Sequence, residues 1–361
     1  MAHELTIRAD GFVEMGYLEG VQRWHGLGNE LKPGASIEEW RKQSGLDYRV
    51  LRSKIRYNTV RGEESDAANW RCMDDMHVFF RNDTGAALGI GSAKFKLVQP
   101  GETLEFFRDL VGAAGFELQT AGSLFDGRKY WAMASTNKEA IILDKRDKVR
   151  ANLLCSTACD GSMATVAKFI AGQVVCNNTL QGAMGERGGG IVKVTHRTTF
   201  DAKAVKAELG VESAMSAFDR TVDAMRRMAE TRMSHEAMIL ATCGLFKPGY
   251  LEMTADEQAK VLRTKPVEPV ARMACDNTTL HADMDGGNGT VYGWLNAVTE
   301  YVDHQAVAKG EFKADNRMDS AWFGRGADVK EKAFAMASDI ATATGKGSAT
   351  DSVNAWLAQH S

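Results

Sequence analysis

Lysine and arginine occupy every second position in four separate stretches of the chain, a spacing that suits binding to a polyanion. In a β-strand, alternate side chains point to the same side, so each stretch would present its basic groups on one face. Ile55, Phe95, Val149 and Val194 would then point to the opposite, apolar face. If the four strands share one sheet, that sheet has a cationic face suited to a nucleic-acid backbone. The stretches are residues 52–56, 94–96, 146–150 and 193–197.

These stretches supply most of the residues that we predict to contact phosphate groups. They are Arg52, Lys54, Arg56, Lys94, Lys96, Arg146, Lys148, Arg150, Lys193 and Arg197. Arg128 and Tyr130 are also two positions apart, so we expect Tyr130 to offer its ring for stacking on a base beside the Arg128 charge. A glycine-rich stretch at 185–190 lacks the Lys-Ser/Thr ending of a P-loop. We expect a loop there, from which Arg187 contacts the nucleic-acid backbone.

The positive charge is local, because the whole chain of 361 residues has a formal net charge of −3. It is densest at 41–61, where Asp47 is the single acid. The basic side chains of that segment are Arg41, Lys42, Arg49, Arg52, Lys54, Arg56 and Arg61. A run of this kind is also typical of an ordinary solvated face, but its recurrence on several strands favours a binding function.

The pattern of the chain predicts an α+β fold, with an antiparallel β-hairpin sheet and packed helices in the N-terminal half and a mostly helical C-terminal half. Asp126-Gly127 predicts a tight hairpin turn, and Ser36 with Glu39 predicts a capped helix. We expect three parts: an N-terminal arm and short helix at 1–47, a β-rich core domain at 48–200 and a mainly helical region at 201–361.

Apolar spacing predicts where the helices lie. We expect helices near 37–44, 101–115, 254–264, 291–304 and 329–341, and one long helix or a broken pair at 211–245. The first 35 residues contain many glycines and predict an ordered arm or loop. The tail at 342–348 predicts a flexible end.

Several kinds of chemistry find no support in the sequence. Cys155 and Cys159 are the only closely spaced pair of thiols, and four positions along a strand span about 13 Å, too far for one metal ion. No Gly-x-Ser-x-Gly motif is present, so we predict no catalytic residues, no metal and no cofactor. Scattered cysteines and the lack of a signal or membrane-spanning segment predict a soluble protein of a reducing cytoplasm.

Five separated motifs resemble a family of phage- and plasmid-borne proteins, known as a domain of unknown function. The motifs occur in order at 24–28, 45–47, 81–85, 175–180 and 296–304. The resemblance implies a gene carried by phages, prophages or plasmids, and hence a bacterial host cell. It brings no catalytic residues, so six motif positions have no assigned role: Trp24, His25, Asn177, Asn178, Thr179 and His304.

Together these observations predict a non-catalytic nucleic-acid-binding protein, with single-stranded DNA as the favoured partner. Its role would be binding or annealing in recombination or replication, with several subunits side by side as a homo-oligomer and no membrane association. An alternative is a protein-interaction module, an anti-defence or host-takeover factor whose acidic helical half contacts a host protein. An enzyme acting on nucleotides is a third possibility, but it would need residues that only the folded chain brings together.

Overall fold

The computed structural model describes most of the chain. The described residues are 5, 7–21, 27–59, 69–113, 115–143, 147–173, 179–180, 191–276, 289–306, 319–345 and 348–360. They form two compact units that are discontinuous in sequence. Unit 1 takes Met1–Thr136, Leu153–Lys168 and Ile191–Leu209, and unit 2 takes Asn137–Asn152, Phe169–Gly190 and Gly210–Ser361.

The larger sheet has eight strands in the order β10-β9-β8-β7-β6-β1-β2, with β11 also paired to β9. Antiparallel pairing joins β1 to β6, β6 to β7, and β9 to both β10 and β11, whereas β1 and β2 are parallel. The strands are β1 (Met15–Leu18), β2 (Asn29–Leu31), β6 (Glu117–Leu124), β7 (Lys129–Ile141), β8 (Lys148–Ala158), β9 (Thr165–Gln173), β10 (Thr179–Leu180) and β11 (Ile191–Val194).

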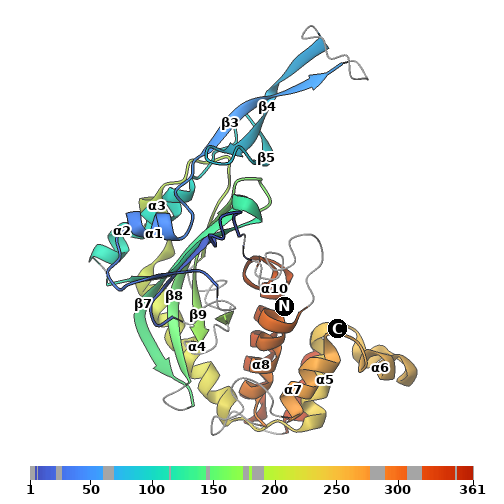
Figure 1. Cartoon of the computed structure of the whole chain (residues 1–361). Coiled ribbons are helices and arrows are strands. Elements are labelled where there is room, and N and C mark those ends of the chain that lie inside the picture. The colour runs from blue at the N-terminus through green and yellow to red at the C-terminus, as the bar shows by residue number, and fades with distance from the viewer. Residues whose placement is uncertain are drawn as a thin grey trace. The chain divides into compact units, whose positions relative to one another are not determined.

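A second sheet of three antiparallel strands belongs entirely to unit 1. It consists of β3 (Val50–Asn58), β4 (Trp70–Arg81) and β5 (Ala87–Ser92), in that order. Figure 1 shows β3 and β4 as a long two-stranded ribbon that extends beyond β5 and away from the rest of unit 1. We call these two paired strands the arm, which is a different segment from the N-terminal arm predicted at 1–47.

Three helices complete unit 1. They are α1 (Ile37–Gln43), α2 (Pro100–Ala113) and α3 (Ala202–Leu209). Helix α1 begins where predicted, because Ser36 and Glu39 form a reciprocal capping box. Helix α2 packs on α1 and on β6, and α3 packs on β11, so Phe106, Phe107 and Leu104 are fully buried.

Unit 2 consists mainly of helices around its own apolar core. They are α4 (Val211–Glu230), α5 (His235–Phe246), α6 (Ala255–Val261), α7 (Val267–Asp276), α8 (Val291–Glu300), α10 (Arg325–Thr344) and α11 (Ala349–His360). Helix α8 is buried almost throughout, with Trp294 and Tyr292 inaccessible to solvent. A π-helical turn, Tyr301–Gln305, extends it. Within the described residues, none of the helices combines the length and apolar character needed to cross a bilayer.

The predicted fold class is confirmed: sheet dominates the N-terminal half and helices the C-terminal half. The Asp126-Gly127 hairpin is confirmed as the link between β6 and β7, and 211–245 is a broken pair of helices. Two predictions are wrong. The first 35 residues contribute β1 and β2 to the larger sheet, and residues 342–344 form the end of α10, with a further helix, α11, beginning at Ala349.

Candidate nucleic-acid interface

The arm is exposed on both of its faces over most of its length. Val50 and Arg81, which pair at its base, are buried, whereas residues 51–58 and 70–78 are all exposed or half-buried. A two-stranded ribbon without a packed face gains little from burial of its own side chains. Its residues are therefore placed for contact with something outside the unit.

An irregularity in the pairing interrupts the register of the arm near its middle. Lys54 pairs with His77 but the next residue, Ile55, pairs with Met73, so β4 carries extra residues at this point. Irregularities of this kind increase the local twist of a ribbon. One extra residue, Asp74, accepts a hydrogen bond from Lys54 Nζ at 3.1 Å. Both side chains are more than half exposed, so the pair contributes little free energy and is easily exchanged for another partner.

Beyond this irregularity, each face of the arm combines a basic group with an aromatic ring. Residues directly opposite each other in an antiparallel pair lie on the same face. Tyr57 is opposite Arg71 on one face, and Trp70, opposite Asn58, shares the other face with Arg56. Tyr57 is 50% exposed and Trp70 is 43% exposed. Within the described part of the chain, Arg56 has no carboxylate partner.

A basic pocket lies beside the arm, where three turns of unit 1 meet. It has a volume of about 710 Å³ and is bordered by the turns at 92–95, 161–164 and 195–197. All of its ionisable lining residues, Lys94, His196 and Arg197, are basic. Such a lining favours an anionic ligand.

Arg52 connects this pocket to the arm. Its guanidinium donates to the carbonyl oxygens of Phe95 at 2.6 Å and Ala93 at 3.4 Å. It also lies 5.6 Å from the centre of the Phe79 ring. The Phe95 ring contacts Phe79 on one side and stacks on His196, with ring centres 4.3 Å apart. These contacts fix the pocket wall to β3 and β4.

Two glycines of β5 make room for close contacts, one with a ring of the same sheet and one with a neighbouring turn. A Cβ at Gly91 would lie 2.5 Å from the Phe79 ring, and one at Gly89 would lie 2.8 Å from the Cα of Asp160. Neither position has room for a side chain, and at Gly89 this is because the backbone of another turn comes close. The small sheet is therefore packed directly against the turn that forms one border of the basic pocket.

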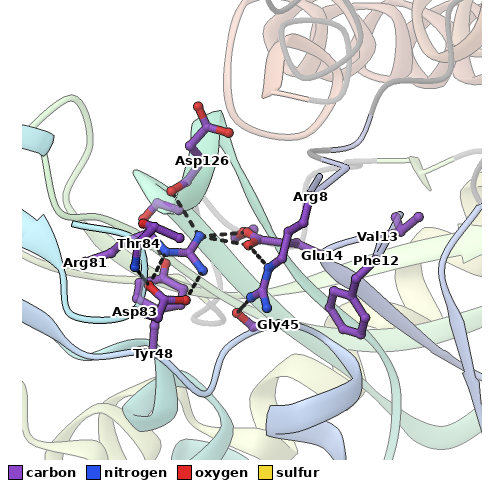
Figure 2. A network of polar contacts seen from close by, with 12 residues as sticks. Arg8, Phe12, Val13, Glu14, Gly45, Tyr48, Arg81, Asp83, Thr84 and Asp126 are labelled. Atoms are coloured by element: carbon purple, nitrogen blue, oxygen red, sulfur yellow. Dashed lines mark hydrogen bonds and ion pairs between the residues drawn. The ribbon is translucent and has the colours of Figure 1, made fainter. Parts of the chain in front are cut away.

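At the base of the arm, Arg81 is buried between two carboxylates (Figure 2). Its guanidinium donates to both oxygens of Asp83, at 2.9 and 2.8 Å, and to Glu14 at 2.8 Å. It also lies 3.8 Å from the centre of the Tyr48 ring. Arg8 donates to Glu14 from the other side, at 2.7 Å. Because Glu14 directly precedes β1, this network ties the last residue of β4 to the larger sheet.

Hydrogen bonds, neighbouring charges and burial shift the pKa values of the groups in this network. The hydrogen bond from Arg81 holds the pKa of the Asp83 carboxyl below its ordinary value. Burial lowers the pKa of Arg81, but the hydrogen bonds to Asp83 and the charge of Glu14 outweigh this and raise it. Burial raises the pKa of Tyr48, whose hydroxyl donates to the Gly127 carbonyl at 2.8 Å. Arg81 therefore stays charged and holds the base of the arm in place.

The basic stretches do not share one sheet, so the condition for a single cationic sheet face is not met. Residues 52–56 lie in the three-stranded sheet, whereas Lys148, Arg150 and Lys193 lie in the larger one. Residues 94–96 follow β5 outside any strand. They still lie close to β3, because the backbone at 93–95 accepts the hydrogen bonds of Arg52.

Lys148 and Arg150 alternate with the buried Val149, as predicted, but they belong to unit 2 and share a carboxylate. Glu139 lies 3.7 Å from Lys148 Nζ and accepts a hydrogen bond from Arg150 Nε at 2.8 Å. Nearby, Lys138 forms an ion pair with Asp219 at 2.7 Å. The positive charge of this region is largely balanced.

The remaining predicted contacts are placed as follows. Lys193 and Arg197 are exposed, on and just after β11, and Arg128 is half-buried. The expectation of an accessible ring at Tyr130 is wrong, because the side chain is 1% exposed and its hydroxyl donates to the Val98 carbonyl. Arg146 and Arg187 lie outside the described residues.

Metal ligands and reactive thiols do not gather in the described residues. No group of three or more His, Cys, Asp or Glu side chains among them could hold a metal ion. Cys155 and Cys159 are buried, and burial raises the pKa of each thiol to about 12. The thiol of Cys72, on the arm opposite Arg56, is exposed.

Comparison with known protein families gives one match, and it covers more than half of the sequence. The model of a domain of unknown function, DUF932, matches residues 87–322. The chain belongs to this family. The matched region includes the basic pocket and most of unit 2, and it begins after the arm. No curated protein and no solved structure matched the chain.

The five motifs on which the family resemblance rests lie in different parts of this chain. The motif at 81–85 forms the turn after β4, where Gly85 has a φ of +72°, and Arg81 and Asp83 form the buried network with Glu14. In unit 2, Asp303 and Lys330 form a buried ion pair at 2.7 Å. His304 lies in the π-helical turn and Thr179 in β10. Trp24, His25, Asn177 and Asn178 lie outside the described residues.

Three residues of the site were missed in the sequence. Trp70 and Arg71 lie on β4, the strand that pairs with the basic stretch. Together with Cys72 and Met73 they form a sequence that is only weakly typical of a strand. His196 lies inside a predicted stretch, but nothing local places its ring against Phe95, 101 positions earlier. Only the fold brings these side chains to one surface.

Proposed function

We propose that this DUF932 protein binds single-stranded nucleic acid, favouring DNA, through the arm and the basic pocket of unit 1, without catalysing a reaction. The observation that carries the proposal is the combination of accessible rings and cations on both faces of the arm. Single strands are held by basic groups that follow the backbone and by aromatic rings on which bases stack. Trp70 and Tyr57 supply the rings, and Arg56 and Arg71 supply the charge.

The arrangement also suits strand annealing in recombination or replication. Contacts to phosphate leave the base edges free to pair, and several subunits side by side would extend the contact along a strand. A homo-oligomer of this kind, in a bacterial host cell of a phage or plasmid, is therefore part of the proposal. It agrees with the context implied by the resemblance to phage- and plasmid-borne proteins.

Unit 1 contains the predicted phosphate contacts that have the best support. They are Arg52, Lys54, Arg56, Lys94, Lys96 and Arg197, all on the arm or at the turns beside the pocket. Lys193 is exposed on β11 and remains a further candidate. Lys148 and Arg150 have weaker support, because a strand would have to compete with Glu139 for them.

The test is a charge reversal on the arm. A triple variant, Arg52→Glu, Lys54→Glu and Arg56→Glu, should lose measurable binding to a fluorescent oligothymidylate at low salt. A matched control makes the same change of charge at exposed positions of unit 2, with Lys260→Glu, Arg263→Glu and Lys265→Glu, and should bind like the parent. If the arm variant binds as tightly as the parent, the arm is not the interface.

A second candidate is a protein-interaction module, an anti-defence or host-takeover factor. The exposed apolar side chains Tyr57, Trp70 and Met73 favour it, because such groups are also typical of protein interfaces. Here the basic groups would contact a protein, and nucleic acid would not compete. A pull-down from host lysate with and without nuclease treatment separates the two candidates, since a nucleic-acid-mediated partner is lost on digestion.

A further inference from the structure

His196 is held in a way that requires both of its ring nitrogens to donate. Nδ1 lies 2.9 Å from the carbonyl oxygen of Lys96, and Nε2 lies 3.0 Å from that of Met163. A neutral imidazole has a single N–H, so only the imidazolium can donate to both oxygens. In the neutral ring, one nitrogen lone pair would face a carbonyl oxygen across a hydrogen-bonding distance.

The charged groups around His196 do not compensate a positive ring. The turn before it, at 94–96, carries Lys94 and Lys96, and its own turn carries Arg197. The third turn carries Asp160, whose carboxylate accepts a hydrogen bond from the Ser162 amide at 2.9 Å. From β3, Arg52 donates to the carbonyl oxygen of Phe95, whose ring stacks on His196. The elements packed around the ring therefore carry four basic side chains and one carboxylate, and the contacts of the ring favour a further positive charge.

We infer that the basic pocket is a phosphate-binding subsite whose affinity depends on protonation of His196. A phosphate group would be held by Lys94 and Arg197, and its charge would offset the repulsion between them and the imidazolium. Because an anion favours the protonated ring, binding and proton uptake are linked, and each strengthens the other. The hydroxyls of Ser92 and Thr195, which also border the pocket, are suited to the remaining phosphate oxygens.

The inference rests on the proposed function, since the phosphate is taken to belong to a bound strand. The pocket volume of about 710 Å³ is also that of a small-molecule site. A free nucleotide would fit such a site and would offer the same phosphate group as a bound strand. Two probes distinguish these sources: a fluorescent oligothymidylate and thymidine monophosphate. Each is titrated into the full chain between pH 5 and 8, where ordinary histidines change charge.

For the parent, affinity for the oligothymidylate should fall roughly tenfold across this range, because the phosphate loses the attraction of the imidazolium charge. His196→Gln keeps a donor but cannot titrate, so its affinity should vary much less with pH and match that of the parent at pH 8. Lys94→Gln changes a pocket residue that takes no part in the His196 hydrogen bonds, so it tests the phosphate contact alone. It should weaken binding at every pH while keeping the pH dependence.

The outcomes separate the two proposals. If the oligothymidylate binds and the parent and His196→Gln have the same pH dependence, the inference is wrong and the proposed function stands. If the oligothymidylate fails to bind at any pH but thymidine monophosphate binds with a His196-dependent profile, the proposed function is wrong and the pocket is a nucleotide site. If neither probe binds, both proposals fail.

Discussion

The arm and the β7–β8 surface carry the same sequence pattern but have different electrostatic surroundings. The β7–β8 surface consists of Lys138, Lys148 and Arg150, with their partners Glu139 and Asp219. On the arm, Lys54 contacts only an exposed carboxylate, and Arg56 has none among the described residues. On the β7–β8 surface, all three cations are ion-paired. Alternation in sequence predicts which side chains share a face, but the fold decides whether their charge is free.

The largest expected effect concerns the anchor of the arm. Arg81→Met takes one of its two arginine partners from the buried Glu14 and leaves Asp83 unpaired, which should lower the free energy of unfolding by about 3 kcal/mol. Arg150→Met breaks a pair near the surface and should cost at most about 1 kcal/mol. Urea denaturation of both variants measures the difference. Equal losses would show that the Arg81 network does not hold the base of the arm.

The rings of the arm should have the next largest effect, and on binding rather than stability. Trp70→Ala and Tyr57→Ala each remove an accessible stacking surface and should weaken oligothymidylate binding by about 1–3 kcal/mol. Tyr130→Phe is the control, because it removes a hydroxyl from a buried ring and should leave binding unchanged. Fluorescence anisotropy at fixed salt makes the comparison. Unchanged affinity of both alanine variants would limit the arm to phosphate contacts.

The smallest effect is on salt dependence, and it compares the two regions directly. Loss of one phosphate contact to a single strand should reduce the slope of log affinity against log salt by about 0.7. Arg56→Gln should show this reduction. Lys148→Gln should not, since Glu139 already offsets its charge. A reduced slope for the Lys148 variant alone would move the interface to the β7–β8 surface.

Features set by neighbouring residues were predictable from the sequence. The capping box of Ser36 and Glu39 defines the start of α1, and Asp126-Gly127 defines a hairpin turn because both residues adopt positive φ there. The alternation of Lys148, Val149 and Arg150 correctly gives the buried and the half-buried side at the start of β8, whereas both sides are buried from Ala151 onward. In each case, the deciding interaction spans only a few residues.

Features set by distant residues were not predictable. Strand β1 contains Gly16, a weak strand former, and it forms because β6 and β2 pair on either side of it. Helix α11 follows a glycine-containing segment that reads as a flexible tail, but Ser348 caps its first turn by accepting from the Asp351 amide. The stack of Phe95 on His196 likewise needs the complete fold of unit 1.

The most direct test of the proposal is the protection of Cys72 by a bound strand. This thiol is exposed and lies opposite Arg56 on the arm. The thiols of Cys155 and Cys159 should react slowly, because burial raises the pKa of each to about 12. Alkylation is followed by peptide mass spectrometry, with and without saturating oligothymidylate. We predict that Cys72 reacts quickly in the free protein and several-fold more slowly when the strand is bound. An unchanged rate at Cys72, under conditions where anisotropy confirms binding, would contradict the placement of nucleic acid on the arm.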